Sequence, residues 1–216
     1  MDAFGNQLWD KIPVFYVQIR GNDDLKRENT IVKIINLRTE GQYSISCLRP
    51  DNQKYAIDVS IVSSVRGLTG CYFSNSMFSG KPLINQVDEI IDFSWDSGFI
   101  NQQIIGPASI RWTGFIQALY SEHINFEIDY EVFDDVKLWI EDILLINTPN
   151  NIQSGKYFVQ ENILYRAKIE CTRNFYTNRD TSVRLIWYSR RIQRSKIPSK
   201  YLFNSVEQIS GSPVII

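Results

Sequence analysis

Apolar and polar residues alternate along several short stretches of this chain, which is the pattern of β-strands with one buried face. In the clearest stretch, residues 125–132, the apolar positions are Phe126, Ile128, Tyr130 and Val132. The alternation pauses at Asp134 and Asp135 and resumes with Val136, Leu138 and Ile140. This pattern predicts a β-hairpin whose turn carries two adjacent carboxylates.

The rest of the chain repeats this pattern in shorter pieces separated by polar connections. Strands are predicted at Val14–Arg20, Ile31–Ile35, Gly41–Cys47, Tyr55–Val62, Ile90–Trp95, Tyr165–Cys171 and Val183–Trp187. Polar connections are predicted at Ser97–Pro107, Asn147–Gly155 and Asn174–Asp180. No helix longer than a turn or two is expected. Short alternating strands joined by polar turns predict an all-β sandwich architecture.

A set of motifs around the central strands resembles the protective-antigen-fourteen (PA-fourteen) domain. The matching residues are Gly67–Phe73, Arg111-Trp112-Thr113-Gly114, Asp134-Asp135, Lys137-Leu138-Trp139-Ile140, Ser182–Trp187 and Ile197–Leu202. The resemblance implies a β-sandwich of a kind found in bacterial binary toxins, in some glycosidases and in yeast adhesins. It also implies a lectin-like activity, because several members bind sugar through calcium.

The two ends of the chain resemble a filamin-type immunoglobulin-like repeat. The matching residues are Asp2-Ala3-Phe4-Gly5-Asn6, Gly41–Ser46, Pro50, Tyr55-Ala56-Ile57 and the ending Ile209–Ile216. The resemblance implies that residues 1–64 form an incomplete immunoglobulin-like domain completed by a strand at 205–216, with a PA-fourteen-type β-sandwich at 65–204 inserted into it. Residues 55–62 are then expected to pair antiparallel with residues 212–216.

The resemblance to adhesin-type PA-fourteen domains implies a candidate calcium site. Calcium prefers six to eight oxygen ligands, and carboxylates supply the negative charge. The implied ligands are Asp134, Asp135, Asn174, Asn178 and Asp180. The chain departs from the family pattern at Val136, where a glycine is usual, and after Asn174, where the loop is longer and bulkier. The alternative is that the aspartates serve only the hydrogen bonds of a turn.

A glycan site at the same loop follows from the same resemblance. Phe175 and Tyr176 are the candidate stacking residues, since aromatic faces suit the apolar faces of sugar rings, and Asp134 and Asp135 complete the ligand-binding set. The alternative is that the two aromatic residues pack within their own loop. Trp112 and Trp139 are expected in the core.

Composition narrows the classes of function. A net charge of -1 argues against a nucleic-acid partner bound through charge. No apolar run is long enough for a transmembrane segment, and no signal peptide is visible. His123 is the only histidine, so neither a catalytic triad nor a histidine metal cluster is expected. Cys71 and Cys171 are expected to remain free thiols rather than to pair, and Cys47 is the third cysteine.

These observations predict a non-catalytic adhesion or carbohydrate-binding module of a larger surface or fibrous protein, with glycans as partners and calcium as the cofactor that the resemblance implies. Its location is expected to be extracellular or at the cell surface. The alternative is a structural repeat unit of a filament or scaffold, in which immunoglobulin-like strands join neighbouring copies of the same protein and no glycan is bound.

Overall fold

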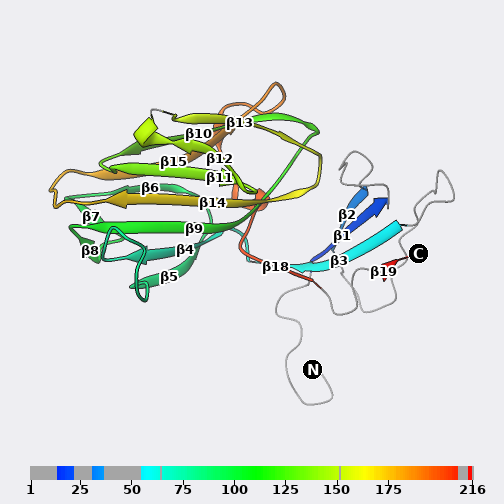
Figure 1. The fold of residues 1–216 in the computed structure, drawn as a ribbon, viewed down its shortest axis with the longest axis horizontal. Coiled ribbons are helices and arrows are strands. Elements are labelled where there is room, and N and C mark those ends of the chain that lie inside the picture. The colour runs from blue at the N-terminus through cyan, green and yellow to red at the C-terminus, as the bar shows by residue number, and fades with distance from the viewer. Residues whose placement is uncertain are drawn as a thin grey trace, which may run out of the picture. The chain divides into compact units, whose positions relative to one another are not determined.

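Two compact units make up the chain in a computed structural model (Figure 1). The first unit is Met1–Ser64 together with Ser205–Ile216, and the second is Val65–Asn204. The structure describes residues 14–21, 31–36, 55–63, 65–150, 152–208 and 214–215. The strand predicted at 41–47 and the motif at 2–6 lie outside the described residues. No described helix has the length and apolar character that a membrane span requires.

The first unit contains one antiparallel sheet with the strand order β18-β3-β1-β2, and β19 also pairs with β3. Its strands are β1 (Val14–Gly21), β2 (Ile31–Asn36), β3 (Tyr55–Val62), β18 (Val206–Gln208) and β19 (Val214–Ile215). Val214 pairs with Ile57 and Ile215 with Ala56 in antiparallel register, as expected from the resemblance of the two ends to a filamin-type repeat with a displaced ending. The tail of the chain therefore shares a sheet with residues that precede the second unit.

The second unit is a sandwich of two antiparallel sheets. The larger sheet has the order β12-β11-β14-β9-β4-β5, with β17 beside β9: β4 (Leu68–Phe73), β5 (Ile84–Asp88), β9 (Ala108–Gln117), β11 (Asp135–Ile140), β12 (Ile143–Asn147), β14 (Leu164–Arg173) and β17 (Leu202–Phe203). The smaller sheet has the order β13-β10-β15-β16, with β6 beside β15: β6 (Asp92–Trp95), β10 (Glu122–Glu131), β13 (Ser154–Val159), β15 (Thr181–Tyr188) and β16 (Ser195–Lys196).

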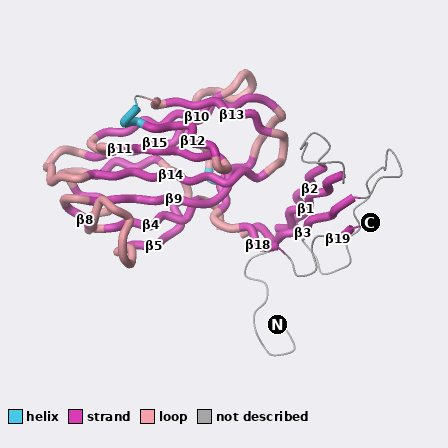
Figure 2. The backbone as a smooth tube through the Cα atoms, viewed as in Figure 1, coloured by secondary structure: helices cyan, strands magenta, loops and turns pink. Residues whose placement is uncertain are grey.

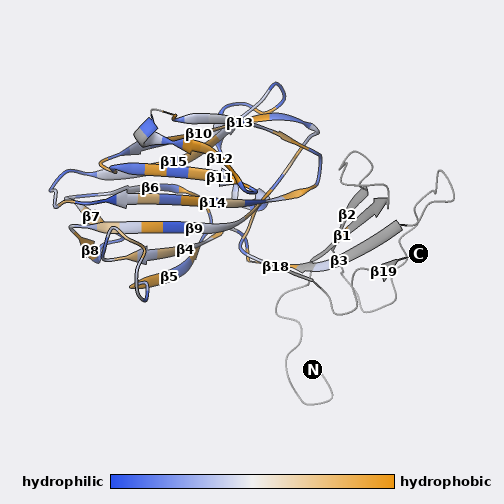
Figure 3. Cartoon of the chain, viewed as in Figure 1, coloured by the Kyte–Doolittle hydropathy of each residue, from blue (hydrophilic) through white to orange (hydrophobic). Residues whose placement is uncertain are grey.

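The core of the sandwich lies between these sheets. Hydrophobic and hydrophilic residues alternate along strands such as β9 and β14 (Figure 3), and the inward residues are almost completely buried. Phe93 of the smaller sheet stacks on Trp112 of the larger sheet, with ring centroids 5.8 Å apart. Among the described residues of the second unit, helical structure is confined to the 3-10 turns η2 (Thr148–Asn150) and η3 (Ser199–Tyr201), and the rest are strands and loops (Figure 2).

The predicted hairpin around Asp134 and Asp135 is wrong, although both of its strands exist. β10 pairs with β13 and β15, whereas β11 pairs with β12 and β14, so these consecutive strands belong to opposite sheets. Val132 adopts a positive φ of 67°, which is rare for a β-branched residue, and Phe133 is 7% exposed. The chain therefore turns at these residues and crosses from one sheet to the other.

Further corrections concern single elements. The connection expected at Ser97–Pro107 contains a small hairpin, β7 (Phe99–Ile100) and β8 (Ile104–Ile105), whose Ile100 and Ile104 are buried. Trp112 is fully buried as expected, but Trp139 is only half-buried, because it points outward from β11 and lies beneath the ammonium group of Lys168.

Cys71 and Cys171 are free thiols, as predicted. β9 lies between β4 and β14, so the two cysteines are two strand spacings apart, about 9.6 Å. Disulfides need Cα atoms within about 7 Å of each other. Burial raises the pKa of the Cys171 thiol, which keeps it protonated and unreactive.

Candidate functional site

Two connections that are far apart in the sequence pack together at one end of the sandwich (Figure 1). We call residues 97–106, residues 174–180 and Asp134 the loop cluster. The backbone N–H of Ser97 donates to Oδ1 of Asp180 at 3.0 Å. A Cβ atom on Gly98 would lie 1.7 Å from the carbonyl oxygen of Thr177, so only glycine permits this close contact at a φ of 74°.

The buried side chain of Arg173, at the end of β14, holds the loop cluster together. Its guanidinium donates to the carbonyl oxygen of Gly98 at 2.9 Å, to that of Gly106 at 2.9 and 3.0 Å, and to the Thr181 hydroxyl at 3.1 Å. Arg173 is 0% exposed. Burial lowers the pKa of its guanidinium, and the negative charge of Asp134 opposes that shift. The fixed, planar set of donors therefore fastens both ends of the β7–β8 hairpin to the sandwich.

Asp134 joins the crossover between the sheets to the loop after β14. Its backbone N–H donates to the carbonyl oxygen of Thr172 at 2.9 Å, and its Oδ2 accepts from the backbone N–H of Asn174 at 2.6 Å. The side chains of Asn174 and Asn178 are exposed. Asp134 thus acts as a turn-stabilising carboxylate and fixes the start of the 174–180 loop.

Asp135 is directed to a different partner from Asp134. Its Oδ2 forms an ion pair with the ammonium group of Lys137, two residues along the same face of β11. Its Oδ1 is buried without a hydrogen-bond partner among the described residues. Asp134 precedes β11 and Asp135 is its first residue, and the two carboxylates bond to different partners.

The calcium site stays a prediction, because the described carboxylates bond to different groups. Asp134, Asp135 and Asp180 each serve a separate partner, and the ammonium group of Lys137 already balances the charge of Asp135. In the described part of the chain, no group of three or more His, Cys, Asp and Glu side chains gathers as metal ligands. The structure therefore brings Asp134 and the 174–180 loop together, but it does not converge the expected carboxylates on one point.

Phe175 and Tyr176 present aromatic surface at the loop cluster. Phe175 is 42% exposed and Tyr176 is 74% exposed. The Tyr176 ring lies against Gly106, where an added Cβ would come within 2.5 Å of the ring. The backbone beneath it is held by Arg173. The ring is therefore supported from below and open to solvent.

The sequence patterns did not predict the role of Arg173. They also did not predict that Gly98 and Gly106 allow the loops to pack closely. A signal for Arg173 was present, because the inward positions of β14 at Ile169 and Cys171 lead by the period of two to residue 173. The partners of that inward arginine are backbone carbonyls, which carry no sequence signal.

The fold defines the class of this unit as a two-sheet all-β domain with two packed loops at one end. The chain belongs to the PA14 domain family, whose model matches residues 64–201. It is 34% identical over 142 residues to the anti-sigma-I factor RsgI3 of Acetivibrio thermocellus, a match that covers 64% of this chain and 21% of that protein. The chain thus spans about a fifth of this curated relative.

Solved structures show the same fold. An anti-sigma factor domain-containing protein from Clostridium clariflavum is 31% identical, with a TM-score of 0.56, over 68% of this chain and 50% of that one. A PA14 sugar-binding domain from an RTX adhesin has a TM-score of 0.50 at 11% identity, over 65% of this chain and 99% of that one, which is a likeness of fold alone.

These comparisons correct the expected location. The extracellular or cell-surface assignment rested on the likeness to adhesins. The relatives that are identical to this chain at about a third of the aligned positions are anti-sigma factor proteins instead. The extracellular or cell-surface assignment is therefore wrong.

Proposed function

We propose that this chain is a non-catalytic carbohydrate-binding module of a longer protein, and that it binds glycan at the loop cluster without calcium. The observation that carries the proposal is the Tyr176 ring, which is 74% exposed although it packs against Gly106, whose carbonyl oxygen is bound by Arg173. An exposed aromatic ring that does not need to be ordered on binding is a suitable platform for a sugar ring.

Polar groups around this platform support the proposal. The exposed amides of Asn174 and Asn178 supply donors and acceptors for sugar hydroxyls beside Phe175 and Tyr176. The fold is that of a domain described as sugar-binding in an adhesin, and the relatives described as anti-sigma factors are longer chains. A carbohydrate-recognition module within a regulatory protein agrees with both likenesses.

Titration calorimetry against a panel of oligosaccharides, in calcium and in a chelator, tests this function. Tyr176→Ala is expected to weaken binding about tenfold or more, equivalent to about 1.4 kcal/mol. Gly106→Ala should act in the same direction, because its Cβ displaces the ring.

Phe158→Ala is the matched control, since it removes an exposed ring from β13, beside the start of β10 and away from Asp134. Equal affinities for Tyr176→Ala and Phe158→Ala would contradict the proposal, as would the absence of binding across the panel.

For the first unit we propose an incomplete immunoglobulin-like domain of the filamin type, into which the PA14 domain is inserted. The antiparallel pairing of β3 with β18 and β19 supports it. Hydrogen exchange should then show the amides of β3 and β19 opening together, and independent opening would contradict the insertion. Assembly of neighbouring copies through this unit stays a prediction, which sedimentation of the isolated chain would test.

A further inference from the structure

A surface cavity of about 360 Å³ lies between the end of β6 and the β7–β8 hairpin of the loop cluster. It is lined by Ser94, Trp95, Asp96, Ser97, Phe99 and Gln102. Its volume is at the lower end of the range of about 300–1,000 Å³ that is usual for small-molecule sites. Neither the sequence motifs nor the proposed binding at Tyr176 accounts for it.

The apolar part of the cavity is aromatic and rigid. Trp95 is 9% exposed and stacks on Phe93 at a centroid distance of 5.0 Å and an interplanar angle of 7°. Phe93 in turn stacks on Trp112 in the core, so the indole of Trp95 is fixed to the centre of the sandwich. Phe99 is 38% exposed and supplies a second aromatic surface.

The polar part of the cavity has unused hydrogen-bonding capacity. The side chains of Ser94, Asp96 and Gln102 are exposed, and none of them has a hydrogen-bond partner within the part of the chain that the structure describes. Together they offer a hydroxyl, a carboxylate and an amide. A few convergent polar groups around an aromatic surface are typical of a site for a polar ligand that also has an apolar face.

The charge of the lining selects among such ligands. Among the described residues that line the cavity, Asp96 is the only charged one and none is basic. A carboxylate accepts hydrogen bonds from sugar hydroxyls but repels a uronate or a sulfate group. The lining therefore favours a neutral sugar over an acidic one.

We propose that this cavity is a second subsite, in which a neutral sugar ring contacts Phe99 and Trp95 and donates hydroxyl hydrogen bonds to Asp96 and Gln102. The inference rests on the proposed carbohydrate binding at the loop cluster. The two places are joined directly, because the N–H of Ser97 in the cavity wall donates to Asp180 and Gly98 contacts Thr177. One oligosaccharide chain thus spans the cavity and the Tyr176 platform.

The test compares short and long neutral oligosaccharides, and the corresponding uronic-acid oligomers, by titration calorimetry with the whole chain. Phe99→Ala and Gln102→Ala should each weaken binding of the long neutral oligosaccharides about tenfold and leave the short ones that occupy the Tyr176 platform unchanged. Gln103→Ala is the control, because Gln103 is an exposed neighbour that does not line the cavity. Asp96→Asn should raise the affinity for the uronic-acid oligomers, since it removes the repelling charge and keeps an acceptor.

Different results would refute the second subsite and the proposed sugar binding at Tyr176. If the native chain binds neutral oligosaccharides, and the Phe99→Ala and Gln102→Ala variants bind them as tightly as Gln103→Ala does, the second subsite is refuted while binding at Tyr176 stands. If the native chain binds no oligosaccharide, both are refuted. Thermal melting of each variant confirms that the fold is retained.

Discussion

The guanidinium of Arg173 donates two hydrogen bonds to the carbonyl oxygen of Gly106, at 3.0 Å from Nε and 2.9 Å from Nη2, although the residues are far apart in the chain. The same Nη2 atom reaches Gly98 at 2.9 Å. One buried side chain thus anchors both ends of the β7–β8 hairpin. The loop surface on which sugar binding is proposed depends on this anchor.

Replacing Arg173 with alanine is expected to destabilise the second unit by about 3–5 kcal/mol, because it leaves buried carbonyl oxygens and the Thr181 hydroxyl without their donors. Urea denaturation followed by tryptophan fluorescence measures the change. Arg179→Ala removes an exposed arginine from the adjacent loop and should change stability by less than about 0.5 kcal/mol. Similar losses in the two variants would show that Arg173 does not anchor the hairpin.

The buried carboxylate of Asp88, at the end of β5, stabilises the edge of the larger sheet. Asp88 accepts hydrogen bonds from the Tyr72 hydroxyl at 2.6 Å, the Trp112 indole at 2.7 Å and the Gln86 amide at 2.7 Å. Asp88→Ala leaves these donors unpaired and is expected to cost about 2–4 kcal/mol of unfolding free energy. Glu89→Ala, on the next residue and exposed, is the control. An unchanged denaturation midpoint for Asp88→Ala would contradict this role.

The same contact predicts a loss of stability at alkaline pH. Burial and the neighbouring charge of Asp88 raise the pKa of the Tyr72 phenol well above its ordinary value of about 10. Above pH 10 the unfolded chain releases this proton and the folded chain retains it. The contribution of Tyr72 to the free energy of unfolding is therefore intact below pH 10 and falls as the pH rises. The decrease in the free energy of unfolding that Tyr72 causes approaches about 1.4 kcal/mol per pH unit. Tyr72→Phe should remove that part of the slope, and an identical alkaline profile in this variant would refute the assignment.

Calcium is expected to leave the melting temperature of the native chain unchanged, because the ammonium group of Lys137 already balances Asp135. In Lys137→Ala that carboxylate loses its cation, but Asp134 and Asp180 still bond to other groups, so added calcium should leave the melting temperature of this variant unchanged as well. Lys200→Ala removes a charge from η3 and should not respond. A calcium-dependent rise in the native chain would restore the calcium site implied by the family resemblance.

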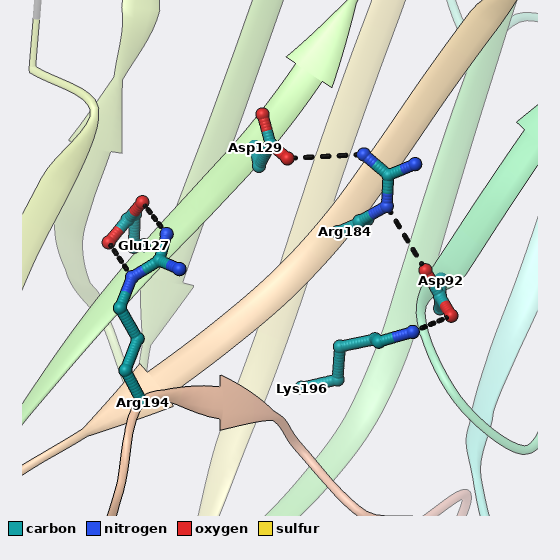
Figure 4. Close-up of polar contacts among 6 residues, drawn as sticks. All are labelled: Asp92, Glu127, Asp129, Arg184, Arg194 and Lys196. Carbon is teal, nitrogen blue, oxygen red and sulfur yellow. Dashed lines mark hydrogen bonds and ion pairs between the residues drawn. The ribbon is translucent and has the colours of Figure 1, made fainter.

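The outer face of the smaller sheet carries a set of ion pairs (Figure 4). Arg184 of β15 bridges Asp129 of β10 at 3.1 Å and Asp92 of β6 at 3.2 Å, and Lys196 also pairs with Asp92. These side chains are partly exposed, so Arg184→Ala should cost only about 0.2–1 kcal/mol at low salt and less at high salt. Denaturation in a salt series checks this, and a large loss that is independent of salt would contradict it.

The sequence by itself determined the strands with one buried face and the family of the second unit. The inward positions of β11 at Val136, Leu138 and Ile140 and those of β14 at Ala167 and Ile169 follow from the period of two. The pairing of the tail with β3 was also predictable, from the resemblance of the two ends to a filamin-type repeat whose last strand is displaced along the chain.

Only the tertiary structure decided that β10 and β11 lie in opposite sheets, that residues 97–106 meet residues 174–180, and that Arg173 is buried between them. The physical reason is that alternation reports which face of a strand is buried, whereas the partner of a strand is chosen through backbone hydrogen bonds, which are alike at every residue. The carbonyl oxygens that Arg173 uses are likewise common to all residues. Their convergence exists only in the folded chain.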